Sequence, residues 1–162
     1  MTQQEFIAAA ERYKDSIFRL AFQYCKNAYD AEDIVQTVLL KLLSRAPAFE
    51  SEVHRKNWLM KVTANDCKKL LRSPWRTRHE QLEDYAETLS AEDSFPDRTL
   101  FDAVMELPRP CRVATYLYYY EGYSVKEIAQ ITGSNPSTIR TRMQRARALL
   151  KDKLKEGWSD DQ

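Results

Sequence analysis

The sequence predicts an all-α protein in which two small helical domains, over residues 1–75 and 96–158, are joined by an acidic linker over residues 76–95. Two observations predict this class. Apolar residues recur at steps of three and four along most of the chain, which is the period of an amphipathic helix, and no strand-like alternation interrupts them. The stretch from Glu80 to Pro96 is polar and weakly periodic, as expected of a linker with at most a short helical piece.

Three helices are expected in the first domain. The face of the first carries Phe6, Ala10, Tyr13, Ile17, Leu20 and Tyr24. Asn27 and Asp30 mark a turn and the start of the second helix. Pro47 ends the second helix, whose wide apolar stripe consists of Ile34, Val35, Val38, Leu39, Leu42 and Leu43. The third helix runs from about Glu52 to Arg72, and Ser73-Pro74 closes it. Its apolar residues are Trp58, Leu59, Val62 and Leu70.

The second domain begins near Pro96. Its first helix carries Leu100, Phe101 and Val104 on one side. A break is expected at residues 107–110, where two prolines fall close together. The next helix runs from Cys111 to Glu121, and Gly122 stops it because glycine adopts the left-handed conformation without a steric penalty.

Residues 124–147 read as two short helices about a glycine turn, SVKEIAQITGSNPSTIRTRMQRAR. Ser124 and Glu127 form a capping box at the start of the first helix, and Gly133 stops it. Ser134 and Pro136 supply a cap and an early-turn proline for the second helix. This tight spacing is typical of a helix-turn-helix.

The second helix of this pair has two different sides. Its apolar residues are Ile139, Met143, Ala146 and Leu150. Hydrogen-bond donors lie opposite or on the flanks: Ser137, Thr138, Arg140, Thr141, Arg142, Gln144, Arg145 and Arg147. Such side chains suit base edges and phosphates in a major groove. A surface helix with merely solvated arginines is the alternative, and the capped preceding helix and tight turn disfavour it.

Charge is strongly segregated although the net charge is only +1. Residues 54–79 hold eight basic side chains against one acidic, a balance of +7. Residues 80–106 hold nine acidic against one basic, a balance of −8, and residues 134–155 hold seven basic against one acidic, a balance of +6. Two basic blocks that flank an acidic one indicate two separate contacts with a polyanion.

Several classes of protein are disfavoured. No apolar run is long enough to span a bilayer and the N-terminus lacks the order of a secretory signal, so a cytoplasmic protein without membrane insertion is expected. Cys25, Cys67 and Cys111 lie far apart and are odd in number, which favours reduced thiols. With only two histidines, we predict no metal site and no cofactor. No acid, base and nucleophile cluster in the sequence, so an enzyme is not expected.

At three places the residues resemble one family. The stretch LPRPCRVATYLYYYEGYSVKEIAQITGSNPSTIRTRMQRARALLKDKL resembles the promoter-reading domain of bacterial sigma factors of the extracytoplasmic-function (ECF) group, within the sigma-70 family. DAEDIVQTVLLKLL, from Asp30 to Leu43, is similar to the family's polymerase-clamp-binding helix, and NWLMKVTANDCKKLLRS, from Asn57 to Ser73, to its promoter-melting helix. Order and spacing also fit, so the resemblance covers nearly the whole chain.

The resemblance implies a protein that binds core RNA polymerase, directs it to double-stranded promoter DNA and holds the melted strand. The residues that it places on the polymerase are Asp30, Glu32, Asp33, Gln36 and Thr37. The carboxylates suit a basic coiled-coil partner. The alternative is that Glu32 and Asp33 simply favour the helix N-terminus through its dipole, and both readings can hold together.

For the promoter-melting helix, the chemistry fits single-stranded DNA. The phosphate-following and base-contacting residues are Lys61, Lys68, Lys69, Arg72 and Asn65. Trp58 offers a stacking surface, although its spacing favours the core. An unstacked base needs a pocket or an aromatic platform, and the resemblance to the family places such a pocket in the preceding stretch, Phe49 to Arg55. Thr37 and Lys69 stand where the family often has acidic residues, and Asn135-Pro136 departs from its usual start of the reading helix.

Members of this family are commonly held by an anti-sigma factor, so the resemblance also implies such a partner. The acidic linker is expected to thread a positively charged polymerase channel, with a solvated tether as the alternative. Two rival functions remain open: a stand-alone helix-turn-helix regulator, which needs only the second domain on DNA, and a pure interaction protein, which does not need the arginine-rich face.

Overall fold

The computed structural model describes residues 1–45, 48–73 and 98–160, and every regular element in these ranges is a helix. The chain divides into two compact units, Met1–Ala91 and Glu92–Gln162. The fold is therefore all-α with two helical domains, as the sequence predicts. The acidic linker expected over residues 76–95 and the helix-ending Pro47 lie outside the described residues.

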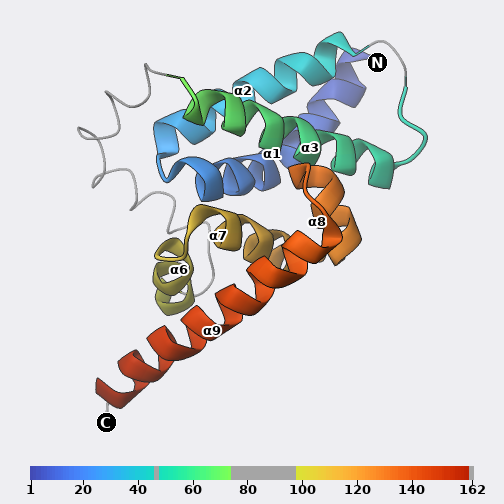
Figure 1. Cartoon of the computed structure of the whole chain (residues 1–162). Helices are drawn as coiled ribbons and strands as arrows, with labels where there is room; N and C mark the ends of the chain where they lie inside the picture. Colours follow the sequence, from blue (N-terminus) through green and yellow to red (C-terminus); the bar gives the residue numbers. More distant parts are fainter. Residues whose placement is uncertain (46–47, 74–97, 161–162) are drawn as a thin grey trace. The chain divides into compact units, whose positions relative to one another are not determined.

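The described part of unit 1 contains three helices that pack against one another in all three pairs: α1 (Gln3–Cys25), α2 (Ala28–Ser44) and α3 (Glu52–Leu71) (Figure 1). Its core lies where the three helices meet. The side chains there include Tyr13, Ile17, Leu20, Phe22, Ile34, Val38, Leu42, Leu59, Met60 and Ala64. The three helices that the sequence predicts over residues 1–72 are present, and α3 ends within one residue of its expected end.

Side-chain caps set the starts of these helices. Thr2 and Glu5 form a capping box before α1, and the side chain of Asn27 accepts the N–H of Asp30 at 3.0 Å before α2. Ser51 accepts the N–H of His54 at 3.1 Å before α3. Lys26 adopts a left-handed conformation, with φ of 53°, that stops α1 and turns the chain into α2.

A polar cluster ties α1 to α3. The hydroxyl of Tyr13 donates to Glu52 at 2.6 Å, and Arg55 donates to the other oxygen of the same carboxylate at 2.9 Å. Burial, and then the hydrogen bond to Glu52, raise the pKa of Tyr13, so its hydroxyl stays protonated and continues to donate.

A second polar contact joins α2 to α3 and yields a stability prediction. Lys41 Nζ lies 2.6 Å from Oδ1 of Asp66, a buried carboxylate whose Oδ2 has no hydrogen-bond partner among the described residues. Lys41→Ala would leave this buried charge uncompensated, so we expect it to lower the stability of unit 1 by about 1–3 kcal/mol. Hydrogen exchange of the core amides of α1 to α3 measures this loss.

Lys61→Ala is the matched control because Lys61 is exposed on α3 and makes no ion pair with a carboxylate in the part of the chain described. Equal amide protection in the two variants would show that the Lys41–Asp66 pair contributes nothing to stability.

Unit 2 is built around its longest helix. Its elements are α6 (Arg98–Met105), α7 (Arg109–Thr115), the π-helical turn η1 (Tyr116–Tyr120), α8 (Val125–Thr132) and α9 (Pro136–Asp160). α9 packs against α6, α7 and α8 (Figure 1). Leu107, Cys111 and Ala146 are buried together, with Val104, Leu149 and Leu150 packed against them.

Two expectations for the start of this unit are wrong. Leu100 was placed on the apolar side of its helix with Phe101, yet its side chain is 45% exposed while Phe101 is buried. The helix expected from Cys111 begins earlier, at Arg109, because Pro110 lies in its first turn, where a missing N–H costs nothing. The buried guanidinium of Arg112 donates to the carbonyls of Met105 and Leu107, and so supplies hydrogen-bond donors to backbone carbonyls at the end of α6.

The end of the next helix also differs from a regular α-helix. Residues 116–120 form η1, and Gly122 then stops the helix with φ of 76°, as predicted. Tyr116 and Leu117 of the turn are buried, while Tyr118, Tyr119 and Tyr120 are exposed. Single π-helical turns of this kind occur frequently at functional sites.

The described part of the chain has neither a candidate membrane span nor a candidate metal cluster. None of its helices combines the length and apolar character needed to cross a bilayer. Its histidine, cysteine and acidic side chains form no group of three that could hold a metal ion. The three cysteines are buried and free of disulfides.

Candidate nucleic-acid interface

The helix-turn-helix predicted from the sequence is present in unit 2. The Ser124 N–H donates to Glu127 at 3.0 Å, and the Glu127 N–H donates to the Ser124 hydroxyl at 3.2 Å, which completes the capping box before α8. Gly133 has φ of 72° and ends α8. Only residues 133–135 then separate α8 from α9, so the second helix begins at once.

The start of α9 corrects one expectation. Ser134 was expected to cap the helix, but α9 begins at Pro136, and the carbonyl of Asn135 accepts the first helical hydrogen bond from the Ile139 N–H. The hydroxyl of Ser134 instead accepts from the guanidinium of Arg142 at 3.2 Å. Arg142 is therefore held against the turn and half-buried.

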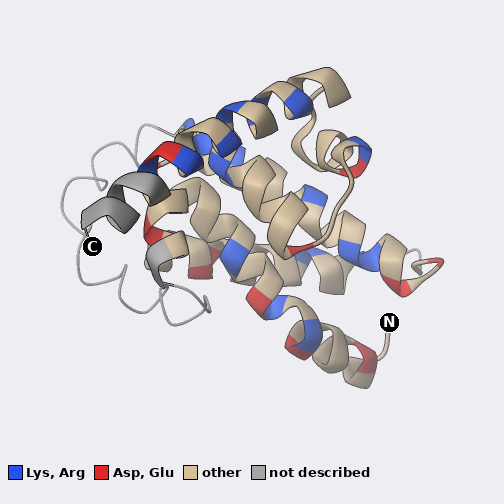
Figure 2. Cartoon of the chain, turned by 90° about the horizontal axis from the view of Figure 1, so that it is seen from below, with Lys and Arg blue, Asp and Glu red and all other residues tan. Residues whose placement is uncertain are grey.

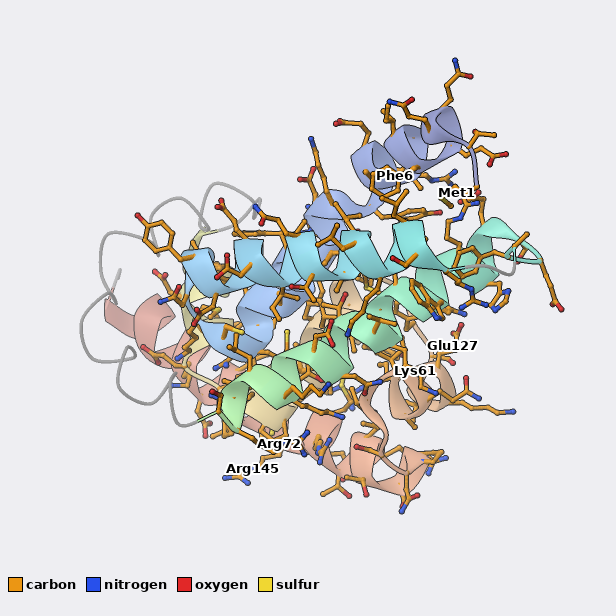
Figure 3. The ribbon with its side chains drawn as sticks, turned by 90° about the horizontal axis from the view of Figure 1, so that it is seen from above. Met1, Phe6, Lys61, Arg72, Glu127 and Arg145 are labelled. Atoms are coloured by element: carbon orange, nitrogen blue, oxygen red, sulfur yellow. The ribbon has the colours of Figure 1, made fainter. Side chains whose placement is uncertain are left out.

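α9 has the two sides that the sequence predicts. Ile139, Met143 and Ala146 are buried against the rest of unit 2. The predicted DNA-contacting side chains are exposed or half-buried: Ser137, Arg140, Thr141, Gln144, Arg145 and Arg147 are exposed, and Thr138 and Arg142 are half-buried. Basic residues recur along the helix (Figure 2), and the labelled Arg145 projects outward from it (Figure 3). The arrangement can donate many hydrogen bonds to a polyanion on one side without disturbing the core.

α3 presents a second basic face, in unit 1. Lys61, Asn65, Lys69 and Arg72 are exposed, and Lys68 is half-buried. Their spacing of three and four residues brings them to one side of the helix, from which the labelled Lys61 and Arg72 both project (Figure 3). Leu59, Met60 and Ala64 are buried on the other side. The single acidic residue in this stretch, Asp66, faces Lys41 on α2 and so does not neutralise the exposed lysines.

Trp58 is not a core residue, contrary to expectation. Its side chain is half-buried at the start of α3, with its ring 5.4 Å from that of Phe49 and with the guanidinium of Arg45 5.0 Å away. Arg45 also lies 4.2 Å from the Phe49 ring, and His54 packs edge-on against it at 5.3 Å. Through its contact with Phe49, the Trp58 ring lies against the stretch, residues 49–55, in which a base pocket is expected.

Beside this aromatic group, unit 1 has a shallow hollow of about 610 Å³ between α2 and α3. It is lined by Thr37, Leu40, Lys41, Ser44, Arg45 and Trp58. The hollow thus connects the aromatic group to the outer face of α2.

That outer face of α2 carries the residues expected to bind polymerase. Glu32, Asp33, Gln36 and Thr37 are exposed, and Asp30 is half-buried. Only Asp30 lies in the first turn of the helix, where the helix dipole acts. Because the effect of the dipole fades beyond that turn, it does not account for Glu32 and Asp33.

Sequence reasoning missed three apolar residues on the same face. Tyr29 is 61% exposed and Leu40 63% exposed, and Leu43, which was expected in the core stripe, is 50% exposed. Leu43 follows Gln36 by seven residues and Leu40 by three, so it shares their side of the helix. This spacing from Gln36 and Leu40 could have predicted from the sequence that Leu43 is exposed. Large apolar side chains left in solvent beside carboxylates are typical of a protein contact.

Each of the two units matches a family model of known proteins. The family model for sigma-70 region 2 matches residues 9–77, and that for sigma-70 region 4 matches residues 97–150. The RNA polymerase sigma factor SigV of Bacillus subtilis is 33% identical over 94% of this chain and 93% of its own length. The ECF RNA polymerase sigma factor EcfG of Rhodopseudomonas palustris is 32% identical over 83% of this chain and 77% of its own length.

A solved structure shares the fold. The sigma factor RpoE of Bartonella quintana, crystallised with the anti-sigma factor NepR, matches with a TM-score of 0.72 and 23% identity over 94% of this chain and 98% of that chain. Since both matched regions are present, a stand-alone helix-turn-helix regulator is not favoured. The chain belongs to the extracytoplasmic-function group of the sigma-70 family and is an RNA polymerase sigma factor.

Proposed function

We propose that the two units grip one promoter at two places while α2 is docked on core RNA polymerase. Residues 1–75 form the domain that binds polymerase and opens the minus-ten element, residues 76–95 form the linker, and residues 96–158 read the minus-thirty-five element. The observation that carries this proposal is the exposed basic face of α9 opposite a buried apolar face, behind a capped α8. A major groove admits such a helix and offers acceptors to its arginines.

Run-off transcription with core polymerase on a library of promoters tests the proposal. The full chain is expected to start transcripts at defined positions, and the selected promoters should share two conserved elements. Random initiation, or no transcript beyond that of core polymerase alone, would contradict it.

On DNA, we assign base contacts to the middle of α9 and phosphate contacts to its flanks. Arg140, Gln144 and Arg145 are exposed and suit base edges. The phosphate set consists of Ser137, Thr138, Arg142 and Arg147. The hydroxyl of Thr141 donates to the Ser137 carbonyl at 3.1 Å, so its oxygen is left to accept from a base amino group, and we place Thr141 with the base-contacting residues.

The polymerase surface of α2 is proposed to be larger than the acidic patch alone. Asp30, Glu32, Asp33, Gln36 and Thr37 supply the charge and hydrogen bonds for a basic helical partner. Leu40 and Leu43 continue the same face toward the hollow and supply apolar area that a protein partner can bury. Charge thus orients the partner, and apolar contact holds it.

The exposed face of α3 is proposed to hold the melted strand. Lys61, Lys68, Lys69 and Arg72 follow the phosphates, and Asn65, exposed among them, bonds an unstacked base. We therefore expect Asn65→Ala to slow promoter opening by up to about tenfold while leaving closed-complex affinity unchanged, since a hydrogen bond contributes a net of roughly 0.5–1.5 kcal/mol. Fluorescence of a base analogue in the melted segment measures opening.

Gln4→Ala removes an equally exposed amide from α1 and serves as the control. If Asn65→Ala opened promoters at the rate of Gln4→Ala, the assignment of Asn65 to a base would be wrong.

Binding to polymerase and to DNA is enough to explain how the chain acts. We infer that the chain works by recognition without catalysing a reaction, in the cytoplasm where core polymerase and DNA are found. An anti-sigma factor is the expected inhibitory partner, by resemblance to the family, and we propose that it competes for the apolar surface of α2.

A further inference from the structure

A hydrogen bond between residues 28 positions apart joins the tyrosine turn η1 to α9. Arg147 Nε donates to the hydroxyl of Tyr119 at 3.0 Å. Both side chains are exposed, Tyr119 to 60%, so the contact lies on the surface of unit 2 and not in its core. A hydrogen bond of this kind fixes the direction of a long arginine side chain that would otherwise sample many rotamers.

The ring of Tyr119 is itself supported. It meets the ring of Tyr118 edge-to-face, with centroids 4.9 Å apart and planes at 76°. In the same turn Tyr120 stacks on the buried Tyr116 at 5.3 Å. Tyr119 therefore has a packing partner for its ring within η1 itself.

Arg147 lies on the side of α9 assigned to DNA. It follows Arg140 by seven residues, close to two helical turns, so the two side chains leave the same side of the helix about 10 Å apart. Lys151 continues this row one turn later and is exposed. Because the bond to Tyr119 uses only Nε–H, the two terminal nitrogens of the Arg147 guanidinium are left to face a phosphate.

We propose that Tyr119 is a positioning residue for promoter DNA: its hydroxyl holds Arg147 ready for a backbone phosphate at the edge of the groove that α9 enters. The proposal rests on the function proposed above for α9 and extends the DNA contact to a turn outside the helix-turn-helix. Tyr119 acts through Arg147. Its contribution is to remove the ordering cost that a free arginine would meet on binding.

A double-variant cycle on the full chain, assembled with core polymerase, tests this. Affinity for a labelled promoter duplex selected from the library is measured at several salt concentrations. Tyr119→Phe keeps the ring, and we expect it to weaken binding about three- to tenfold with the salt slope unchanged, because the charge still reaches its phosphate. Arg147→Gln should weaken binding at least as much and lower the slope by about 0.9, the value for one lost phosphate contact.

In the Arg147→Gln background, Tyr119→Phe should have no further effect, since the group that it positions is gone. Arg147→Lys should keep the salt slope yet lose the dependence on Tyr119, because lysine has no Nε–H. Tyr118→Phe is the control: it removes a hydroxyl from the adjacent exposed ring, which packs edge-on against Tyr119 and, in the described part of the chain, makes no hydrogen bond to Arg147.

Three results would overturn the inference while leaving the proposed function intact: Tyr119→Phe binding like the unaltered chain, losses that add across the cycle, or an unchanged salt slope in Arg147→Gln. Failure of the unaltered chain to bind any promoter with core polymerase would instead overturn the proposed function and this inference with it.

Discussion

Replacing both Arg140 and Arg145 by alanine is expected to lower promoter-specific transcription by about 30-fold or more while the chain still binds core polymerase. Both side chains are exposed on α9, away from its buried apolar residues, so their removal leaves the core of unit 2 unchanged. A good bidentate contact between arginine and a base is worth about 1–3 kcal/mol of discrimination. Two such losses amount to at least about 2 kcal/mol, or roughly 30-fold in promoter affinity. Run-off transcription at limiting promoter measures the effect.

Two comparisons sharpen this experiment. Lys14→Ala removes an exposed positive charge from α1 and should leave promoter transcription unchanged. Arg142→Ala should have an effect of its own on promoter affinity, smaller than that of the Arg140 and Arg145 pair, because its guanidinium is engaged with Ser134 at the turn. Full promoter activity in the Arg140→Ala, Arg145→Ala variant would exclude α9 as the reading helix.

Reversing the charge of Glu32 and Asp33 together, by substitution with lysine, is expected to prevent assembly with core polymerase. Both carboxylates are exposed on α2 beyond the reach of the helix dipole, so the folded unit does not depend on them. Like charges brought together across an interface cost several kcal/mol, which corresponds to at least a hundredfold loss of affinity. Competition with labelled unaltered chain for core polymerase measures it.

The control for this variant is Asp15→Lys, which reverses an exposed carboxylate on α1. It should compete for polymerase as well as the unaltered chain. If the Glu32→Lys, Asp33→Lys variant competed equally well, the acidic face of α2 would not be the docking surface.

Local signals in the sequence predict much of this fold because they act within a few residues. The capping box at Ser124 and Glu127, the left-handed Gly133 and the stop at Gly122 all stand where expected, since each satisfies backbone groups close by in the chain. The apolar period predicts the buried side of α9 in the same way. Leu43 and Leu100 were misplaced because both lie at the margin of an apolar stripe. There, burial depends on which neighbouring helix covers that margin.

Contacts between distant residues could not be predicted. The pair Lys41–Asp66 and the bond between Arg147 and Tyr119 join residues 25 and 28 positions apart, and they form only once helices have packed. Trp58 lies outside the core for the same reason: its ring packs against Phe49 and Arg45 at the start of α3. For the candidate site, the residue types and faces were therefore predictable, whereas the partners that orient them were not.

Footprinting of the assembled polymerase on a single selected promoter tests the central claim most directly. The account predicts two protected segments on the same DNA. Alanine at Arg140 and Arg145 should remove the upstream segment, and alanine at Lys61, Asn65 and Lys69 should remove the downstream one. One continuous segment that the α3 substitutions and the α9 substitutions weaken equally would contradict a grip at two separate places.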